Sequence, residues 1–174
     1  SPEVLLKLMG QPFPSGLNQP EFRSTALANL VFDQNFKTDL WFYYCHEPDK
    51  ITFRTTLYSN LRSEARGEAP FNCTIEVMAD ADTCVAPDLT ERLLVEMKDM
   101  GVIGGEHRVT YEKTISFPKG FPLPTVGFGA NSIKLTEHCQ SLAENVTLLG
   151  RATGKTHFIQ EVLAEIWSIL GDGD

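Results

Sequence analysis

Glycine, lysine and threonine residues near the C-terminus have the types that a phosphate-binding loop requires. An apolar stretch, residues 145–149, runs into Gly150, and the triplet Gly154-Lys155-Thr156 precedes a helical pattern. A Walker A loop has the form G-x-x-x-x-G-K-[ST], in which backbone N–H groups curl around a nucleotide phosphate. Here three residues, not four, separate the two glycines, and no strand is expected after Thr156 to supply an Asp for Mg²⁺. The spacing therefore argues against a nucleoside triphosphatase.

The same segment leaves two other interpretations open. A glycine-rich turn before a helix presents free amides, which together with the helix dipole favour an anionic group. Arg151 and Lys155 would add positive charge to such a site. Alternatively, the segment is an ordinary strand-to-helix turn with Thr156 as the N-cap. Spacing alone does not separate an anion site from a plain turn.

Other residues with chemical potential are scattered along the chain. The four histidines include no pair spaced i, i+4 on a helix, so we expect no metal site. The cysteines match no zinc spacing, and we expect buried free thiols in a reducing compartment, the cytoplasm. They are Cys45, Cys73, Cys84 and Cys139. No catalytic residue is assigned.

Two further groups lie on expected strands. Glu76 stands among apolar residues and could pair with Arg54 across a sheet; the alternative is a solvent-facing pair of small energetic value. The aromatic residues 41–44 could line a substrate pocket, although we expect half of them to belong to the core.

Composition limits the classes of function. The chain has 174 residues, 42% of them hydrophobic, and a net charge of −8. These values predict a single folded domain over residues 1–174 and argue against nucleic acid as a partner. No apolar run is long enough to cross a membrane, and no signal peptide is visible.

The elements that must position these residues follow from periodicity and turn chemistry. We expect strands at 24–32, 39–47, 51–59, 71–79, 106–117 and 145–149, and helices at 2–9, 88–100, 131–144 and 157–170. Residues 39–59 form the clearest hairpin, with its turn at 47–50. The predicted fold is α+β, a mostly antiparallel sheet of about five strands with covering helices.

Details of these elements are also predicted. Val4, Leu5 and Leu8 share one face of the first helix. Asp88 and Glu91 suit a capping box. The helix at 131–144 begins with Asn131 or Ser132 as its cap, and the proline-rich residues 118–124 form a stiff connector.

Six segments in order resemble the C-terminal part of flavin-dependent amine-oxidase-like proteins. The resemblance is to the branch that includes UDP-galactopyranose mutase and protoporphyrinogen-oxidase-like enzymes. The segments are PEVLLKLMG (2–10), DLWFYYCHEPDKITFRTTLYSN (39–60), GEAPFNCTIEVM (67–78), LTERLLVEMKDMGVI (89–103), SFPKGFPLPTVG (116–127) and NVTLLGRATGKTHFIQEVLAEIW (145–167). Each motif is weak alone, and their order across nearly the whole chain carries the resemblance.

The resemblance implies roles for particular residues. The Gly-Arg turn and the start of the last helix would lie against FAD, which assigns cofactor contacts to Gly150, Arg151, Gly154, His157 and Phe158. The hairpin would contribute to substrate binding through Arg54, Tyr44 and Asn60. The turn departs from the family pattern, which has Gly-Arg-x-Gly followed by an aromatic residue.

A larger departure is the lack of a G-x-G-x-x-G motif in these residues. The chain is thus expected to be the substrate-binding portion of a flavoprotein, FAD being held only together with a flavin-binding half. It would not be catalytic alone. Its expected partners are a small-molecule substrate, that half and a second copy in a homodimer. The alternative is a stand-alone non-enzymatic module that binds a small ligand or a protein.

Overall fold

The computed structural model describes residues 2–61, 69–143, 145–150, 153–155 and 158–171. The chain divides into two compact units. Residues 22–122 form one unit, called here the sheet unit. Residues 1–21 and 123–174 form the other, called here the helical unit.

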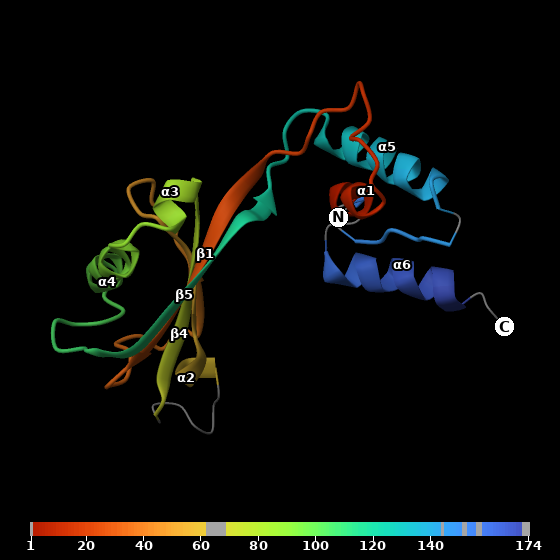
Figure 1. Cartoon of the computed structure of the whole chain (residues 1–174). Helices are drawn as coiled ribbons and strands as arrows, with labels where there is room; N and C mark the ends of the chain where they lie inside the picture. Colours follow the sequence, from red (N-terminus) through yellow and green to blue (C-terminus); the bar gives the residue numbers. More distant parts are fainter. Residues whose placement is uncertain (1, 62–68, 144, 151–152, 156–157, 172–174) are drawn as a thin grey trace. The chain divides into compact units, whose positions relative to one another are not determined.

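The sheet unit contains five antiparallel strands in the order β2-β3-β4-β1-β5 (Figure 1). Their bounds are Phe22–Phe32 for β1, Phe42–Tyr44 for β2, Thr52–Leu57 for β3, Phe71–Ala79 for β4 and Val109–Pro122 for β5. Three helices belong to this unit: α2 (Tyr58–Leu61), α3 (Ala81–Cys84) and α4 (Leu89–Asp99). The predicted α+β class and the antiparallel sheet are confirmed.

The core of the sheet unit lies between the sheet and α4. Alternation buries Ala26, Ala28 and Leu30 on β1, because successive side chains of a strand point to opposite faces. The buried residues of β4 and the helical stripe of α4 meet them, and Figure 1 shows α3 and α4 on the same side of the sheet. Full burial of a side chain such as Leu93 contributes about 1.5–3 kcal/mol. This side of the sheet is called the core face.

Four predictions for the sheet unit are corrected. Strand β2 covers three residues instead of nine, and the four-residue helix α2 takes the place of the end of the expected strand 51–59. Strand β5 continues through Pro122, because a proline is tolerated on an edge strand where its missing N–H is not needed. Asp88 makes no side-chain cap: its backbone (φ −92°, ψ 8°) is not in the extended conformation that an N-cap normally adopts. The short helix α3 was not predicted.

The helical unit contains α1 (Pro2–Leu8), α5 (Phe128–Ser141) and α6 (Ile159–Gly171). Its described core is small, with Leu6, Leu135 and Cys139 buried. The expected apolar face of α1 was wrong, since Leu6 is buried whereas Val4 and Leu8 are exposed.

Two further predictions for the helical unit were wrong. Helix α5 begins at Phe128, after Gly127 in the left-handed conformation (φ 83°), so neither Asn131 nor Ser132 caps it. Residues 145–149 form no strand. A strand needs a neighbour for its backbone hydrogen bonds, and the described part of this unit contains no strand to pair with.

Candidate ligand-binding face

The second side of the sheet is called here the open face, because α3 and α4 cover only the core face (Figure 1). The strand register places one side chain from each strand in a row across it: Tyr44, Arg54, Glu76, Leu27 and Ile115. The rest of the open face comprises Thr25, Asn29, Val31, Phe42, Thr56, Asn72, Thr74, Met78, Tyr111, Lys113 and Phe117.

An ion pair lies in the middle of this row. Arg54 Nε lies 3.1 Å from Glu76 Oε1, and Arg54 Nη2 donates to the same oxygen. Arg54 Nη1 donates to the Tyr44 hydroxyl at 3.3 Å, and the guanidinium carbon lies 5.7 Å from the centre of that ring. The hydrogen bonds with Glu76 and then with Tyr44 raise the pKa of Arg54. The predicted pairing of Arg54 with Glu76 is confirmed, and the structure brings Tyr44 to it.

A chain of uncharged polar groups runs beside the ion pair. The Tyr58 hydroxyl donates to Thr74 Oγ1 at 3.2 Å, and Thr74 Oγ1 donates to Asn29 Oδ1 at 2.8 Å. Asn29 Nδ2 donates in turn to the carbonyl oxygen of Lys113 at 3.3 Å. The open face therefore presents hydroxyl groups and an amide next to a neutralised charge pair.

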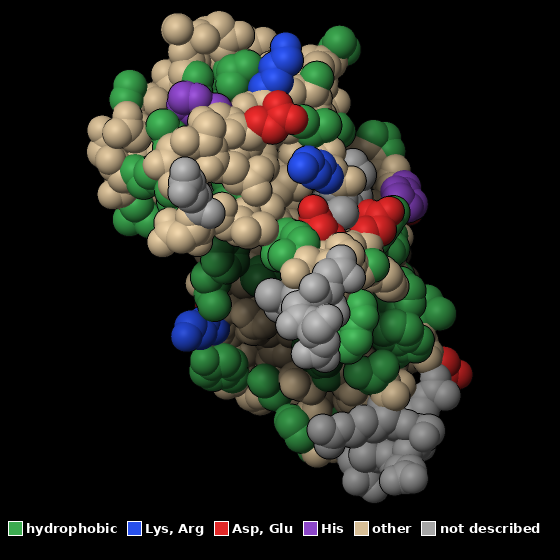
Figure 2. Space-filling view, turned by 90° about the vertical axis from the view of Figure 1, so that its right-hand side faces the viewer, with side chains coloured by type: hydrophobic (Ala, Val, Ile, Leu, Met, Phe, Trp, Pro, Cys, Tyr) green, Lys and Arg blue, Asp and Glu red, His purple; other side chains and the backbone are tan. Residues whose placement is uncertain are grey.

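Aromatic side chains border this polar centre. Phe42 and Tyr44 pack edge to face with their ring centres 5.9 Å apart, and both are exposed. Of residues 41–44, Tyr43 alone packs against the core, and burial raises the pKa of its hydroxyl to about 12. Figure 2 shows hydrophobic side chains at the surface of the molecule between scattered charged ones.

Asn60, the third predicted substrate residue, is buried and holds the backbone. Its Nδ2 donates to the carbonyl oxygens of Thr38 at 2.7 Å and of Leu40 at 2.9 Å. These bonds fix the segment that leads into β2, the strand of Tyr44. The described contacts of Asn60 thus go to the backbone and not to Arg54 or Glu76.

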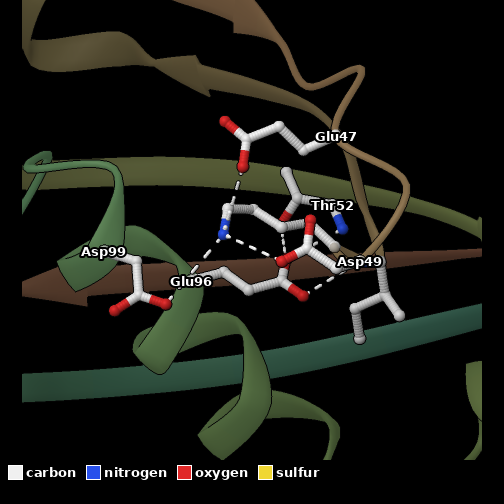
Figure 3. Close-up of polar contacts among 7 residues, drawn as sticks. Glu47, Asp49, Thr52, Glu96 and Asp99 are labelled. Carbon is white, nitrogen blue, oxygen red and sulfur yellow. Dashed lines mark hydrogen bonds and ion pairs between the residues drawn. The ribbon is translucent and has the colours of Figure 1, made fainter.

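The hairpin that carries Tyr44 and Arg54 is fastened to α4 by Glu96 (Figure 3). One oxygen of Glu96 accepts the Ile51 amide at 2.8 Å. The other accepts the Thr52 amide at 3.0 Å and the Thr52 hydroxyl at 2.6 Å. Sequence reasoning missed Glu96, since nothing in the pattern of a helix indicates a bond to a strand 44 residues away.

Lys50 supports the same junction. Its side chain is 10% exposed, and its Nζ lies 3.4 Å from Glu47, 3.8 Å from Asp49 and 4.0 Å from Asp99 (Figure 3). Lys50 therefore links the turn of the hairpin to the C-terminal end of α4 through ion pairs. Together with Glu96 it sets the position of the hairpin on the sheet.

The predicted cofactor residues lie in the helical unit. Gly150 and Gly154 both have left-handed backbones, with φ of 88° and 74°. A Cβ atom on Gly154 would lie 2.8 Å from the carbonyl oxygen of Gly129, so the loop approaches α5 closely. Thr153 is buried, and its hydroxyl donates to the carbonyl oxygen of Gly150 at 2.7 Å.

Of the remaining predicted cofactor residues, the structure describes Phe158. Arg151 and His157 lie outside the described residues. Phe158 is 65% exposed, and its amide donates to Glu161 Oε2 at 2.9 Å. The described contacts of this loop are with its own segment and with α5, and its role toward FAD stays a prediction.

A hollow in the helical unit was not predicted. It has a volume of about 320 Å³ and lies between one face of α5 and two segments that flank it. Its lining mixes amide, hydroxyl and apolar side chains, among them Asn18, Gln19, Phe128, Asn131 and Ser132. No short motif marks it, because residues 18–21 and 125–135 are far apart in the sequence.

Cys73, Cys84 and Cys139 are buried as expected, and Cys45 is partly buried. Burial raises the pKa of the Cys73 thiol to about 12, so this thiol stays protonated and unreactive near neutrality. Among the described residues no cluster of His, Cys, Asp and Glu is arranged to hold a metal ion. None of the described helices has the length and apolar character of a membrane span.

Solved structures share this fold. No protein-family model and no curated protein matches the sequence. Reduced UDP-galactopyranose mutase matches with a TM-score of 0.63 and 16% identity, over 78% of this chain and 29% of that one. A "putative protoporphyrinogen oxidase" from Exiguobacterium sp. 255-15 matches with a TM-score of 0.63 and 14% identity, over 87% of this chain and 34% of that one.

The likeness expected from the order of the segments is thereby confirmed at the level of the fold. The chain spans about a third of the length of each of these two structures.

Proposed function

We propose that this chain is the substrate-binding portion of an FAD-dependent amine-oxidase-like or sugar-nucleotide-mutase-like protein. The observation that supports the proposal is the row Tyr44, Arg54 and Glu76 on the open face of the sheet, in a fold shared with two larger proteins of this kind. In this proposal the open face carries the substrate. Catalysis requires a flavin-binding half in addition to this chain.

The open face suits a ligand with both apolar and hydroxyl or amine groups. Tyr44 and Phe42 offer exposed rings for stacking. Arg54 is held in place by Glu76, so its charge is compensated before a ligand arrives. Tyr58 and Thr74 add hydroxyl groups that can donate or accept. Asn60 would act indirectly, by fixing the segment that precedes β2.

The described residues fit the edge of a flavin ring better than its phosphates. Phe158 is exposed at the start of α6, whereas the Glu161 carboxylate already accepts the Phe158 amide and would repel a phosphate there. Gly150, Arg151, Gly154, His157 and Phe158 are proposed to contact FAD at this edge. The flavin, when bound, would supply the redox chemistry, and this chain would supply one wall of its site.

The helical unit gives independent support for contact with a second, flavin-binding half. Its last helix exposes Ile159, Leu163 and Trp167, at 68%, 59% and 79%. An apolar helix of this kind is typical of a surface that another part of a protein covers. The unpaired segment 145–149 likewise lacks a neighbouring strand within the described chain.

A titration with FAD, with and without a supplied dinucleotide-binding half, tests the flavin role. We expect no tight binding by the chain alone and a yellow complex once the two halves are combined. If the combined halves also leave FAD in the dialysate, the flavin role is wrong.

Ligand binding at the open face is tested separately. Trp41 is half exposed beside Phe42, so in a Trp167→Phe background its fluorescence reports on this region. UDP-galactose and protoporphyrin IX serve as probes, chosen from the names of the two similar structures. We expect binding of at least one probe to weaken about tenfold in Arg54→Ala, as for loss of one charge-assisted hydrogen bond. Arg92→Ala, on the exposed side of α4, is the control and should leave the affinity unchanged.

The alternative function is a stand-alone binding module without enzymatic activity. One observation favours it: every contact of Tyr44, Arg54 and Glu76 described above lies within the sheet unit. Probe binding by the chain that is unaffected by adding the flavin-binding half and FAD would support the module over the enzyme portion.

A further inference from the structure

The outer edge of β5 is long and unpaired. Strand β5 ends the sheet order, pairs with β1 on one side only and is exposed at nearly every residue from Val109 to Pro122. The opposite edge of the sheet is β2, which has three residues. Long exposed edge strands present unpaired N–H and C=O groups, which can pair with another chain. This property is independent of the function proposed above.

One hydrogen bond shows which backbone groups of β5 point outward. The carbonyl oxygen of Lys113 accepts Asn29 Nδ2 from β1, so the backbone groups of Lys113 are turned toward β1. The N–H and C=O of one strand residue point to the same side, and this side alternates along the strand. The backbone groups of Glu112, Thr114 and Ser116 therefore point to the free edge.

Only part of the edge is open to pairing. Pro118 and Pro122 lack N–H groups, and proline on an edge strand is a common protection against pairing. Gly120 lies so close to Thr25 that a Cβ atom would collide with that side chain, and a register shift occurs at this point. Residues 110–117 carry no proline and leave a continuous template.

We propose that two copies of this chain join edge to edge through β5, antiparallel, about a two-fold axis at Thr114. The two sheets would form one sheet of ten strands. In this arrangement the open faces of the two copies lie on the same side of the joined sheet. Even-numbered residues of β5 therefore lie opposite even-numbered residues of the second copy, and odd-numbered opposite odd-numbered. The choice is therefore between axes at successive residues of β5.

Charge and hydrogen bonding select the axis. An axis at Glu112 or Lys113 places two like charges directly opposite each other, which is destabilising. An axis at Ile115 pairs the outward Glu112 with Pro118, which has no N–H to donate. The axis at Thr114 places Thr114 opposite Thr114 of the second copy and Glu112 opposite Ser116. The backbone N–H and C=O groups of all three outward residues then have partners, and no like charges lie directly opposite each other.

Side chains on the open face agree with this register. Tyr111 would lie opposite Phe117 of the second copy, and Lys113 opposite Ile115 of the second copy. Tyr111 is 55% exposed and Phe117 is 44% exposed in the single chain. Aromatic pairs across antiparallel strands are favourable. Two such pairs form at each interface, because the axis repeats every contact.

The test is the mass of the full chain in solution, measured by light scattering over a range of concentrations. We expect a dimer that Thr114→Pro converts to a monomer, because proline removes an outward amide that β1 does not use. Thr114→Val keeps the amide and should stay dimeric. A specific dimer should form at or below about 100 µM. A wild-type chain that stays monomeric up to this concentration would overturn the proposal.

A second pair of variants guards against loss of folding. Thr114→Arg would place two arginines on the axis, whereas Thr110→Arg would place arginine opposite Pro118 of the second copy. We expect only Thr114→Arg to dissociate the dimer, with both circular dichroism spectra unchanged. Equal dissociation by both variants would contradict the register.

Cross-linking distinguishes this edge from any other dimer. In a Cys45→Ser background, Thr114→Cys should join two copies rapidly with a short bismaleimide. Thr110→Cys should not, since the two copies of residue 110 would lie roughly 27 Å apart at 3.4 Å per residue. A wild-type dimer that Thr114→Cys fails to cross-link would place the interface elsewhere and overturn the proposal.

Discussion

The sheet unit and the helical unit differ in how completely each buries its own apolar residues. Fifteen buried residues form the described core of the sheet unit, whereas three form that of the helical unit. The helical unit also exposes Ile159, Leu163 and Trp167 on α6. Since hydrophobic burial is the main favourable term in folding, the two units should differ widely in stability.

This difference teaches where function can be sought in each unit. The sheet unit can hold its open face in place by itself, because α4 covers the core face and Glu96 fastens the hairpin. The helical unit exposes apolar side chains on α6, and its segment 145–149 pairs with no strand of the described chain. The sheet unit is thus the better scaffold for a preformed ligand site, and the helical unit the better candidate for a docking element.

The largest expected effect is on the core of the sheet unit. Leu93 on α4 is fully buried, and Leu93→Ala should lower the free energy of unfolding by about 2–5 kcal/mol. The matched change Leu163→Ala on α6 should alter it by less than about 0.5 kcal/mol, because Leu163 is 59% exposed. Urea unfolding measures both. Equal losses for the two variants would mean that α6 is buried in solution, and the contrast between the units would be broken.

The second effect concerns the bond between the hairpin and α4. Glu96→Ala leaves the amides of Ile51 and Thr52 without their acceptor and should cost about 2–3 kcal/mol. Glu91→Ala, exposed on the same helix, controls for the change in helix composition. Urea unfolding gives the cost, and hydrogen exchange should show faster exchange in residues 42–57. If exchange rises elsewhere but not there, Glu96 does not position the hairpin.

The two units also differ in how well their sequences predict them. Strands β1 and β4 alternate clearly, and β4 was predicted with the bounds 71–79 that it has. The pairing of Arg54 with Glu76 was predicted because Glu76 stands among apolar residues of one expected strand and Arg54, of opposite charge, lies on another. These features depend on local pattern, which a single sequence carries.

Features that depend on distant partners could not be predicted. The contact of Glu96 with residues 51 and 52 depends on how α4 crosses the hairpin. Residues 145–149 have a strand-like composition, but a strand forms only where another strand is available. The place of Asn60 in the backbone network likewise follows from the short helix α2, which has no sequence signal of its own.

The third prediction sharpens the account of the loop in the helical unit. Gly154→Ala should destabilise this unit by about 1–2 kcal/mol, because φ is +74° and the new Cβ would lie 2.8 Å from the Gly129 carbonyl oxygen. Gly129→Ala, inside α5 with open space around it, should stabilise by about 0.5–1 kcal/mol. Hydrogen exchange in α5 measures both. Tolerance of Gly154→Ala would show that the loop does not pack on α5 as described.

The smallest expected effect is a pH dependence that is largest in the sheet unit. Burial raises the pKa of the Cys73 thiol from 9.0 to about 12, so the unfolded chain loses this proton more easily than the folded chain. The stabilisation is complete below pH 9 and is lost as pH rises toward 12, by about 1 kcal/mol between pH 9 and 10. Tyr43, with its pKa raised to about 12, adds a loss that begins only above pH 10. Unfolding in urea at pH 8, 9 and 10 measures the slope, and Cys73→Ala should flatten it. The helical unit should show a smaller change of the same sign, because burial also raises the pKa of its Cys139 thiol. A slope that is as steep in Cys73→Ala as in the wild type would assign the effect to other groups, such as the Cys84 and Cys139 thiols, and remove this distinction between the units.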